Sequence, residues 1–251
     1  MCDQCDNSSL SRRELLKLAG AASALFLASC QDEPAVPILP DVVYEEHLVE
    51  GAGAVRIDPK LIKPPPPMPA QKSTYGDIMP RAAWTRTPLR LREGTPMDGI
   101  HKITIHHSGD GKPFLGTTPT EVATHLQIVQ QAHLQRGMID IAYHFAVDRT
   151  GRLWQLRWLA YEGQHVRMSK NGTRNNEHNV GVVVLGDFNI QAPTVAQRDR
   201  LFELIRKIKL EYSPPPMTAL PVYLHGEIVE TDCPGKRLAP ILKEARQRHS
   251  F

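Results

Sequence analysis

The 251-residue sequence lacks the features that mark several large classes of protein. Its net charge is only +3, and no run of lysine and arginine is interleaved with aromatic residues, so the sequence does not favour nucleic-acid binding. No internal repeat is visible, which argues against a repeat architecture. With 41% hydrophobic and 23% charged residues, the composition is that of a globular protein, and the length suits one substantial domain with extensions.

No apolar run is long enough to cross a bilayer permanently, but a shorter one lies near the start of the chain. The pair Arg12-Arg13 precedes an alanine-rich apolar stretch, an order that is typical of an export signal and resembles a twin-arginine signal. The stretch ends in Leu27-Ala28-Ser29-Cys30, which resembles the lipobox of bacterial lipoproteins, where the chain is cut before the cysteine and its thiol carries the lipid. We therefore predict a signal peptide over residues 1–29 and a lipid on Cys30. The alternative is a simple cleaved signal in which Cys30 is incidental.

Cysteine is scarce, with four residues in the whole chain. Cys2 and Cys5 have the C-x-x-C spacing of some metal and redox sites, but they precede the export signal and would be removed with it. Because Cys30 would carry the lipid, Cys233 would have no disulfide partner in a compartment where disulfides normally persist. A lone thiol in that compartment is either buried and inert or held as a metal thiolate, so Cys233 is a candidate ligand.

Proline is concentrated in one segment. Residues 30–75 contain the run Pro64-Pro65-Pro66-Pro67 and show no apolar period, which favours a stiff polyproline II spacer. We predict a lipid-anchored linker over residues 30–75 and a folded domain over residues 76–251. A small structured subdomain around residues 42–57 is the alternative.

From residue 76 onwards, apolar residues follow the periods of strands and helices. The spacing predicts strands over residues 102–106, 142–147, 153–156, 179–185 and 222–224, and helices over residues 120–135, 194–213 and 238–248. The strand at 179–185 is a nearly continuous β-branched run, which suits burial on both faces. Strands that alternate with helices predict an α/β fold, a single domain with a central mixed β-sheet flanked by helices.

Histidine, by contrast, is plentiful, with 11 residues, so most of them are expected to be packed or solvated, among them His125 and His133 on a predicted helix. His225 ends an apolar strand, and Cys233 follows it after a polar, loop-like stretch, so both side chains can reach one metal. His106 or His107, which close an earlier strand, can supply a third ligand. Two imidazoles and one thiolate would leave zinc a fourth position for water, the pattern of a catalytic site.

A set of short motifs follows in order along the folded part of the chain. They are Arg81-Ala82-Ala83-Trp84, Ile105-His106-His107-Ser108, Asp140-Ile141-Ala142-Tyr143-His144-Phe145, Gly163-Gln164-His165, Asn176 five residues before Gly181, Leu185-Gly186-Asp187-Phe188 and Thr231-Asp232-Cys233-Pro234-Gly235. In this order and spacing, the motifs resemble the family of peptidoglycan recognition proteins and type 2 N-acetylmuramoyl-L-alanine amidases. The resemblance covers about residues 76–249.

The resemblance implies a set of metal ligands. It assigns Zn²⁺ to His106, His225 and Cys233, and strand alternation also favours only one of the two neighbouring histidines, with His107 as the alternative. Members of the family that only bind peptidoglycan have lost this cysteine, so the presence of Cys233 favours catalysis. Cytoplasmic amidases that recycle wall fragments carry a glutamate at the position of Val183, which places this chain nearer the recognition-protein branch.

The resemblance also implies roles for residues around the metal. Tyr143 corresponds to the active-site tyrosine, which can stabilise a tetrahedral oxyanion; packing into the sheet is the alternative. Thr231 lies where some relatives carry a lysine, and its hydroxyl would be a second, uncharged donor. His165 and Asn176 are expected to shape the substrate groove, with plain loop structure as the alternative.

The implied activity is hydrolysis of the amide between N-acetylmuramic acid and L-alanine in peptidoglycan or muropeptides. We expect a monomer on the periplasmic side of the cell envelope, attached to a membrane through its N-terminal lipid. Two other functions fit the family. One is a non-catalytic lipoprotein that binds peptidoglycan and tethers the envelope to the wall, which the complete ligand set disfavours. The other is an antibacterial effector, which the lipid anchor disfavours.

The anchor can be tested by labelling cells with a radioactive fatty acid. We expect Cys30→Ser to abolish labelling, because the lipid is carried by that thiol, and replacement of Arg12-Arg13 by two lysines to leave precursor in the cytoplasm. Cys5→Ser, in the same leader, is the control and should be labelled like the wild type. Normal labelling of the Cys30→Ser protein would show that Cys30 is not the lipid attachment site.

Overall fold

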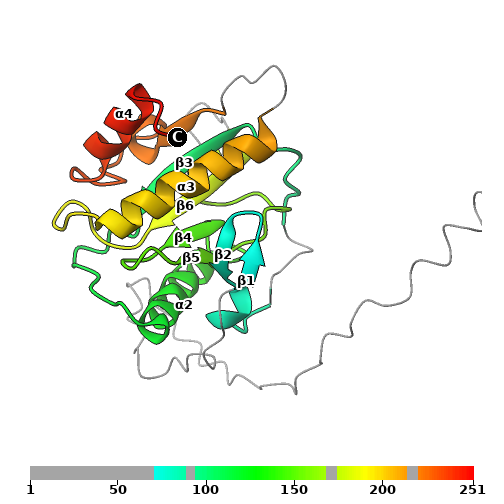
Figure 1. The fold of residues 1–251 in the computed structure, drawn as a ribbon. Coiled ribbons are helices and arrows are strands. Elements are labelled where there is room, and N and C mark those ends of the chain that lie inside the picture. Colours follow the sequence, from blue (N-terminus) through cyan, green and yellow to red (C-terminus); the bar gives the residue numbers. More distant parts are fainter. Residues whose placement is uncertain (1–70, 89–93, 168–173, 214–219) are drawn as a thin grey trace, which may run out of the picture. The chain divides into compact units, whose positions relative to one another are not determined.

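A computed structural model describes residues 71–88, 94–167, 174–213 and 220–251 of the chain. The predicted signal peptide, Cys30 and the predicted linker up to residue 70 lie outside the described residues. Within them the chain forms an α/β domain around a mixed β-sheet with helices on both sides, which confirms the predicted fold class (Figure 1). Among the described helices, none has the length and apolar character that a membrane crossing requires.

The sheet has seven strands in the order β1-β2-β5-β4-β6-β3-β7. β3 lies between β6 and β7 and is parallel to both, and β6 is parallel to β4 on its other side. The pairs β1–β2 and β4–β5 are antiparallel, which makes the sheet mixed. The strands are β1 (Gln71–Ser73), β2 (Gly76–Met79), β3 (Lys102–His107), β4 (Phe145–Val147), β5 (Leu153–Gln155), β6 (Asn179–Val184) and β7 (Val222–Leu224).

Three α-helices are described, α2 (Pro119–Gln135), α3 (Val195–Tyr212) and α4 (Ala239–Gln247). The first two begin with capping boxes. Thr118 Oγ1 accepts the Glu121 N–H at 3.2 Å while the Glu121 carboxylate accepts the Thr118 N–H at 2.9 Å, and Thr194 and Gln197 pair in the same way. Reciprocal caps of this kind satisfy backbone donors that the first turn leaves free, and they fix where each helix starts.

The structure differs from the predicted elements in two places. The predicted strand at residues 142–147 begins only at Phe145, and the Ala142 N–H donates to His133 Nδ1 at 3.0 Å. The two N-terminal strands β1 and β2 are absent from the predicted elements, and the sheet begins at Gln71, ahead of the expected domain start at residue 76.

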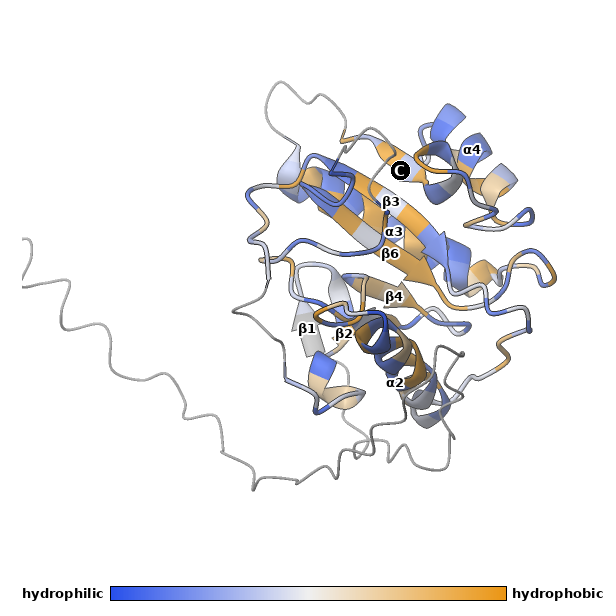
Figure 2. Ribbon diagram, turned by 180° about the vertical axis from the view of Figure 1, so that it is seen from behind, coloured by the Kyte–Doolittle hydropathy of each residue, from blue (hydrophilic) through white to orange (hydrophobic). Residues whose placement is uncertain are grey.

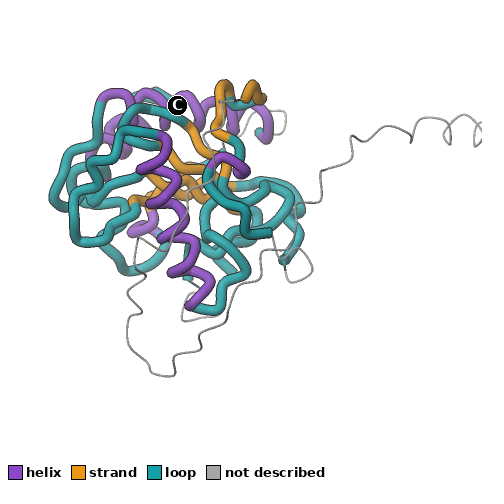
Figure 3. Tube along the Cα trace, turned by 90° about the horizontal axis from the view of Figure 1, so that it is seen from below, coloured by secondary structure: helices purple, strands orange, loops and turns teal. Residues whose placement is uncertain are grey.

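Helices cover the two faces of the sheet. α3 lies in front of the central strands in Figure 1, whereas in the reverse view of Figure 2 α2 is on the viewer's side, below β4, and the central strands are coloured largely as hydrophobic. Seen from below, the strands lie between the helices, and loops form much of the periphery (Figure 3). Ile103 and Ile105 of β3 belong to the core cluster under α3 and α4, and Val183 of β6 belongs to the cluster under α2. β6 is buried along its whole length, as predicted.

A buried histidine joins the sheet to the loop that follows β5. His144 Nδ1 accepts the Gly181 N–H at 2.9 Å, so the ring donates through Nε2 to the Tyr161 carbonyl, also at 2.9 Å. Burial lowers the pKa of His144 to about 4. The folded state thus holds a neutral imidazole in conditions where the unfolded chain, with an ordinary pKa near 6.5, takes up a proton.

This linkage predicts an acid-sensitive fold. The contribution of His144 to the free energy of unfolding is fully present above pH 6.5 and is lost as the pH falls to about 4, in total about 3 kcal/mol. His144→Asn keeps an acceptor for the Gly181 N–H but cannot titrate in this range. In urea unfolding with a metal chelator, the wild type should lose about 1.2 kcal/mol more per pH unit than the variant between pH 6 and 4.5. Equal slopes would mean that His144 is protonated in the folded protein.

Candidate metal centre

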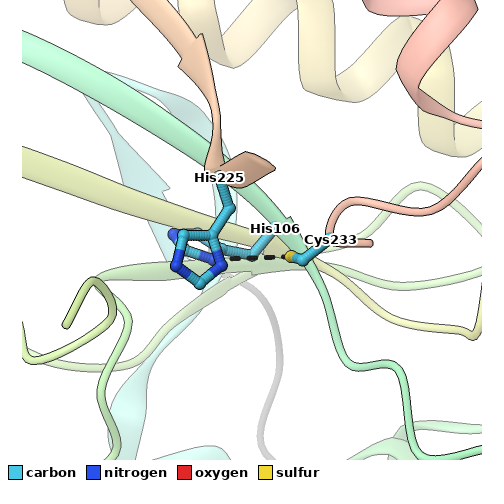
Figure 4. Close-up of side chains that lie close together, drawn as sticks. All are labelled: His106, His225 and Cys233. Carbon is cyan, nitrogen blue, oxygen red and sulfur yellow. Dashed lines mark hydrogen bonds between the residues drawn. The ribbon is translucent and has the colours of Figure 1, made fainter. Parts of the chain in front are cut away.

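Two parallel strands, β3 and β7, place two histidines side by side near their carboxyl ends. Ile105 of β3 is paired with Leu224 of β7, so His106 and His225 are the next residues of the two strands in the same direction. The chain then returns through a loop in which the Gly226 N–H donates to the Cys233 carbonyl at 2.8 Å. Figure 4 shows the three side chains pointing toward one another, and their ligand atoms all lie within 4.8 Å of each other.

The contacts within this group leave ligand atoms free to face a common point. His106 Nδ1 lies 3.6 Å from Cys233 Sγ, which also accepts the His107 N–H at 3.4 Å. The His106 and His225 rings are 4.4 Å apart at their centroids. His225 Nε2 is buried and has no hydrogen-bond partner in the described residues. A buried ring nitrogen without a partner is costly, and a cation at this point would accept the lone pair of a deprotonated His225 Nε2. Two imidazoles and a thiol are donors that suit zinc.

The electrostatic surroundings keep the imidazoles in the form that binds metals. Burial lowers the pKa of His106 well below its ordinary value, and the neighbouring histidines His165 and His225 act in the same direction. Burial also lowers the pKa of His225, to about 4, and raises the pKa of the Cys233 thiol to about 12. The thiolate therefore needs a nearby positive charge, which a divalent cation supplies by direct coordination.

His107 lies on the other face of β3. Its Nδ1 accepts the Phe188 N–H at 3.1 Å, and its ring stacks on that of Phe188 at 6.2 Å between centroids. Because successive side chains of a strand point to opposite faces, the strand that directs Ile105 and His107 toward α3 directs His106 toward α2. The structure thus brings His106, and not His107, to the group with His225 and Cys233.

The two predicted catalytic residues flank the group. The Tyr143 ring lies 5.1 Å from the His106 ring and 5.6 Å from that of His133, and burial raises the pKa of its hydroxyl, which stays protonated. Thr231 is exposed on the returning loop, and its Oγ1 accepts the Cys233 N–H at 3.3 Å. That contact leaves the Thr231 hydroxyl hydrogen available to another acceptor.

The two predicted substrate-binding residues have protein partners. His165 is 6% exposed, and its ring nitrogens contact His106 Nε2 at 3.0 Å and the Asn179 carbonyl at 3.1 Å. The Asn176 amide donates to the Val166 carbonyl at 2.8 Å and accepts the Val166 N–H at 2.9 Å. Asn176 also lines a cavity of about 180 Å³, together with Thr95, Ile139, Arg157, Glu162, Gly163, Gln164 and Arg174.

A larger hollow of about 480 Å³ runs along the loop that carries Cys233. It places Thr231 and Cys233 on one wall and α4 on the other. The remaining lining residues are Asn189, Leu224, Gly226, Glu227, Asp232, Pro234, Gly235, Lys236, Ala239 and Lys243.

Sequence reasoning missed the residues that hold the segment before Tyr143. Asp140 is buried, lies 2.9 Å from Arg81 Nη1 and accepts the Gln130 amide at 2.7 Å. His133, for which the sequence predicts a packed or solvated position, is packed, and its Nδ1 accepts the Ala142 N–H. These contacts join α2 to the chain entering β4. The partners of Asp140 are far from it in sequence, so no local spacing signals them.

Comparison with known proteins identifies the family. The family model described as N-acetylmuramoyl-L-alanine amidase matches residues 95–236. The chain belongs to this amidase family. The resemblance inferred from the sequence motifs is thereby confirmed.

Relatives of this amidase-family chain fall into two groups by name. A peptidoglycan-recognition protein of Drosophila simulans is 25% identical over 175 residues, which cover 67% of this chain and 87% of that protein. The human N-acetylmuramoyl-L-alanine amidase is 25% identical over 170 residues, which cover 66% of this chain and 28% of that protein. The solved structure of wild-type Drosophila PGRP-LB superposes with a TM-score of 0.55 at 25% identity, covering 66% of this chain and 92% of that one.

The two neighbouring histidines provide a test of the geometry. We expect His106→Ala to remove tight zinc binding, because it deletes one of three converging ligands, whereas His107→Ala should keep about one zinc ion per chain. Metal analysis after dialysis, with circular dichroism to confirm folding, distinguishes the two. The opposite ranking would mean that β3 is shifted by one residue, since such a shift moves every side chain to the other face.

Proposed function

We propose that the protein is a zinc-dependent N-acetylmuramoyl-L-alanine amidase that cuts peptidoglycan. The observation that carries the proposal is the convergence of His106, His225 and Cys233 within 4.8 Å. Three protein ligands leave a tetrahedral zinc ion one open position, as catalytic sites require. When bound there, zinc would polarise the substrate carbonyl and lower the pKa of a water ligand from about 15.7 towards 7.

The reaction is hydrolysis of one amide bond. The carbon–nitrogen bond between the lactyl carbonyl of N-acetylmuramic acid and the amine of L-alanine breaks, water supplies the new oxygen, and the products are a carboxylate and a free stem peptide. Negative charge develops on the carbonyl oxygen in the tetrahedral intermediate, so preorganised hydrogen-bond donors beside it lower the barrier.

Tyr143 and Thr231 are the donors that we assign to this charge. The hydroxyl of Tyr143 is protonated, because burial raises its pKa, and its ring stands beside that of His106. The Thr231 hydroxyl accepts from the backbone of the returning loop, so its own hydrogen is free for the substrate. We further assign the cavity beside Asn176 to part of the sugar or stem peptide, since charged and amide groups line it.

A second function fits the family, a non-catalytic lipoprotein that binds peptidoglycan and tethers the envelope to the wall. Relatives named as peptidoglycan recognition proteins support binding as such. The complete set of ligands favours cutting, because a binder has no use for an open metal position. For both functions we propose an exported protein of the cell envelope, with the lipid on Cys30.

Digestion of purified sacculi separates the two functions. Zinc-loaded mature protein, made lipid-free by Cys30→Ser, should sediment with sacculi and release stem peptides. Tyr143→Phe should keep its zinc and lower kcat by about 10²-fold, a typical cost of losing one oxyanion donor. Cys233→Ser should lose zinc and hydrolysis together, because a hydroxyl is a poor ligand for zinc, yet still sediment.

The products are read by mass spectrometry against a known amidase under the same conditions. A chelator should stop the release of stem peptides and leave sedimentation unchanged. If the zinc-loaded protein binds sacculi and frees no stem peptides, the protein is a tether and Cys233 is a structural ligand.

A further inference from the structure

A chain of hydrogen bonds runs from the metal group into the backbone. His106 Nε2 lies 3.0 Å from His165 Nδ1, and His165 Nε2 lies 3.1 Å from the carbonyl oxygen of Asn179. The His106 and His165 rings are nearly perpendicular, at 80°. Both side chains are buried, with 1% and 6% of their surface exposed. The arrangement therefore excludes water from both contacts.

The backbone carbonyl at the end of this series of hydrogen bonds fixes which atom donates in each of them. A carbonyl oxygen can only accept, so His165 Nε2 carries the hydrogen. The neutral His165 ring then has a lone pair on Nδ1, which accepts from His106, and His106 must carry its hydrogen on Nε2. The lone pair of His106 is left on Nδ1, the atom that faces Cys233 Sγ at 3.6 Å. If His165 were doubly protonated, this order of donors and acceptors would be lost. That form is disfavoured, because it would bury a positive charge next to a ligand of the metal cation.

Two glycines form the slot in which the His165 ring lies. A Cβ atom on Gly181 of β6 would lie 2.3 Å from His165 Cδ2, and one on Gly163 would lie 2.4 Å from the same atom. No side chain fits at either position without moving the ring. Glycine weakens a strand interior, so Gly181 within the β-branched run of β6 is explained by this close approach. The slot and the two hydrogen bonds together hold the ring in one orientation.

We propose that His165 is a positioning residue, which fixes the ring and the tautomer of His106 so that Nδ1 is presented to the metal. The role rests on the metal centre of the proposed amidase, and it differs from the substrate contact expected from the sequence. Histidine ligands of metals commonly donate their second N–H to a carboxylate or a carbonyl. Here an imidazole takes that place and passes the hydrogen bond on to the backbone of Asn179.

The first experiment examines the metal-free protein by ¹⁵N NMR of the imidazole rings. We expect both His106 and His165 to carry hydrogen on Nε2 only, with a scalar coupling across the hydrogen bond between His106 Nε2 and His165 Nδ1. A doubly protonated His165, or a hydrogen on Nδ1 of His106, would overturn the proposal. This readout needs neither zinc nor activity, so it is independent of the proposed function.

The second experiment measures the dissociation constant for zinc by competition with a chelator. His165→Phe fills the same slot but neither accepts nor donates, and zinc affinity should fall by about 10- to 100-fold, as for other outer partners of metal ligands. His165→Gln offers an acceptor and a donor and should recover most of the affinity. His125→Phe is the matched control, because it makes the same change at a histidine of α2 whose ring stacks on Phe114, away from the metal group, and its zinc affinity should stay at the wild-type value.

The outcomes separate the positioning role from the amidase function. If His165→Phe keeps the wild-type zinc affinity and raises only the KM for peptidoglycan, His165 is a substrate contact and the positioning role is wrong. If the wild type binds no zinc while the NMR signature is present, the proposed function fails and the hydrogen-bonded chain stands as a structural feature. Loss of affinity in all three variants would reflect general loosening of the fold and would overturn the specific role.

Discussion

The parallel register of β3 and β7 is the constraint on which the candidate site depends. With Ile105 opposite Leu224, the next residue along each chain is a histidine, His106 within β3 and His225 just after β7. β3 is also paired with β6 along its whole length, so it cannot slide without exposing its apolar face. The same alternation that buries Ile103 and Ile105 under α3 turns His106 to the other face. The hydrophobic core therefore fixes the geometry of the metal group.

Burying polar imidazole rings inside the domain costs free energy, and hydrogen bonds to the backbone offset that cost. His133 accepts from the Ala142 N–H, His144 accepts from Gly181 and donates to Tyr161, and His165 donates to Asn179. Each of these rings is thereby neutral and partnered by the main chain, as buried polar groups require. Among the described histidines, His125 and His225 each have a buried Nε2 without a hydrogen-bond partner. His225, unlike His125, lies in the group with His106 and Cys233, so its unpartnered nitrogen marks the position of a ligand.

The features that could be predicted from the sequence are those determined by residues close together in the chain. Thr194 starts α3 through a side-chain cap that reaches three residues ahead, and the β-branched run of β6 is typical of a strand buried on both faces. The two-residue period of a strand predicts that only one of His106 and His107 faces the metal, and the family resemblance assigns that role to His106. The apolar pattern predicts a strand that includes Tyr143, whereas β4 begins only at Phe145 and the Ala142 N–H donates to His133 on α2. The contact between His165 and His106 spans 59 residues, with a helix and two strands between them, so no spacing in the sequence encodes it.

The loop that carries Cys233 is held in place by other contacts than the histidines are. The histidines are placed by strands, whereas the loop is held by backbone hydrogen bonds from Gly226 to Cys233 and from Arg237 to Phe188, at 2.8 and 2.9 Å. A side-chain contact from Asn189 to the Lys236 N–H, at 3.0 Å, ties it to the segment after β6. None of these contacts involves a ligand atom, so the three donors are brought together by the fold itself. A metal held there would use ligands that strands and backbone contacts also position, whereas in small zinc domains the metal itself drives folding.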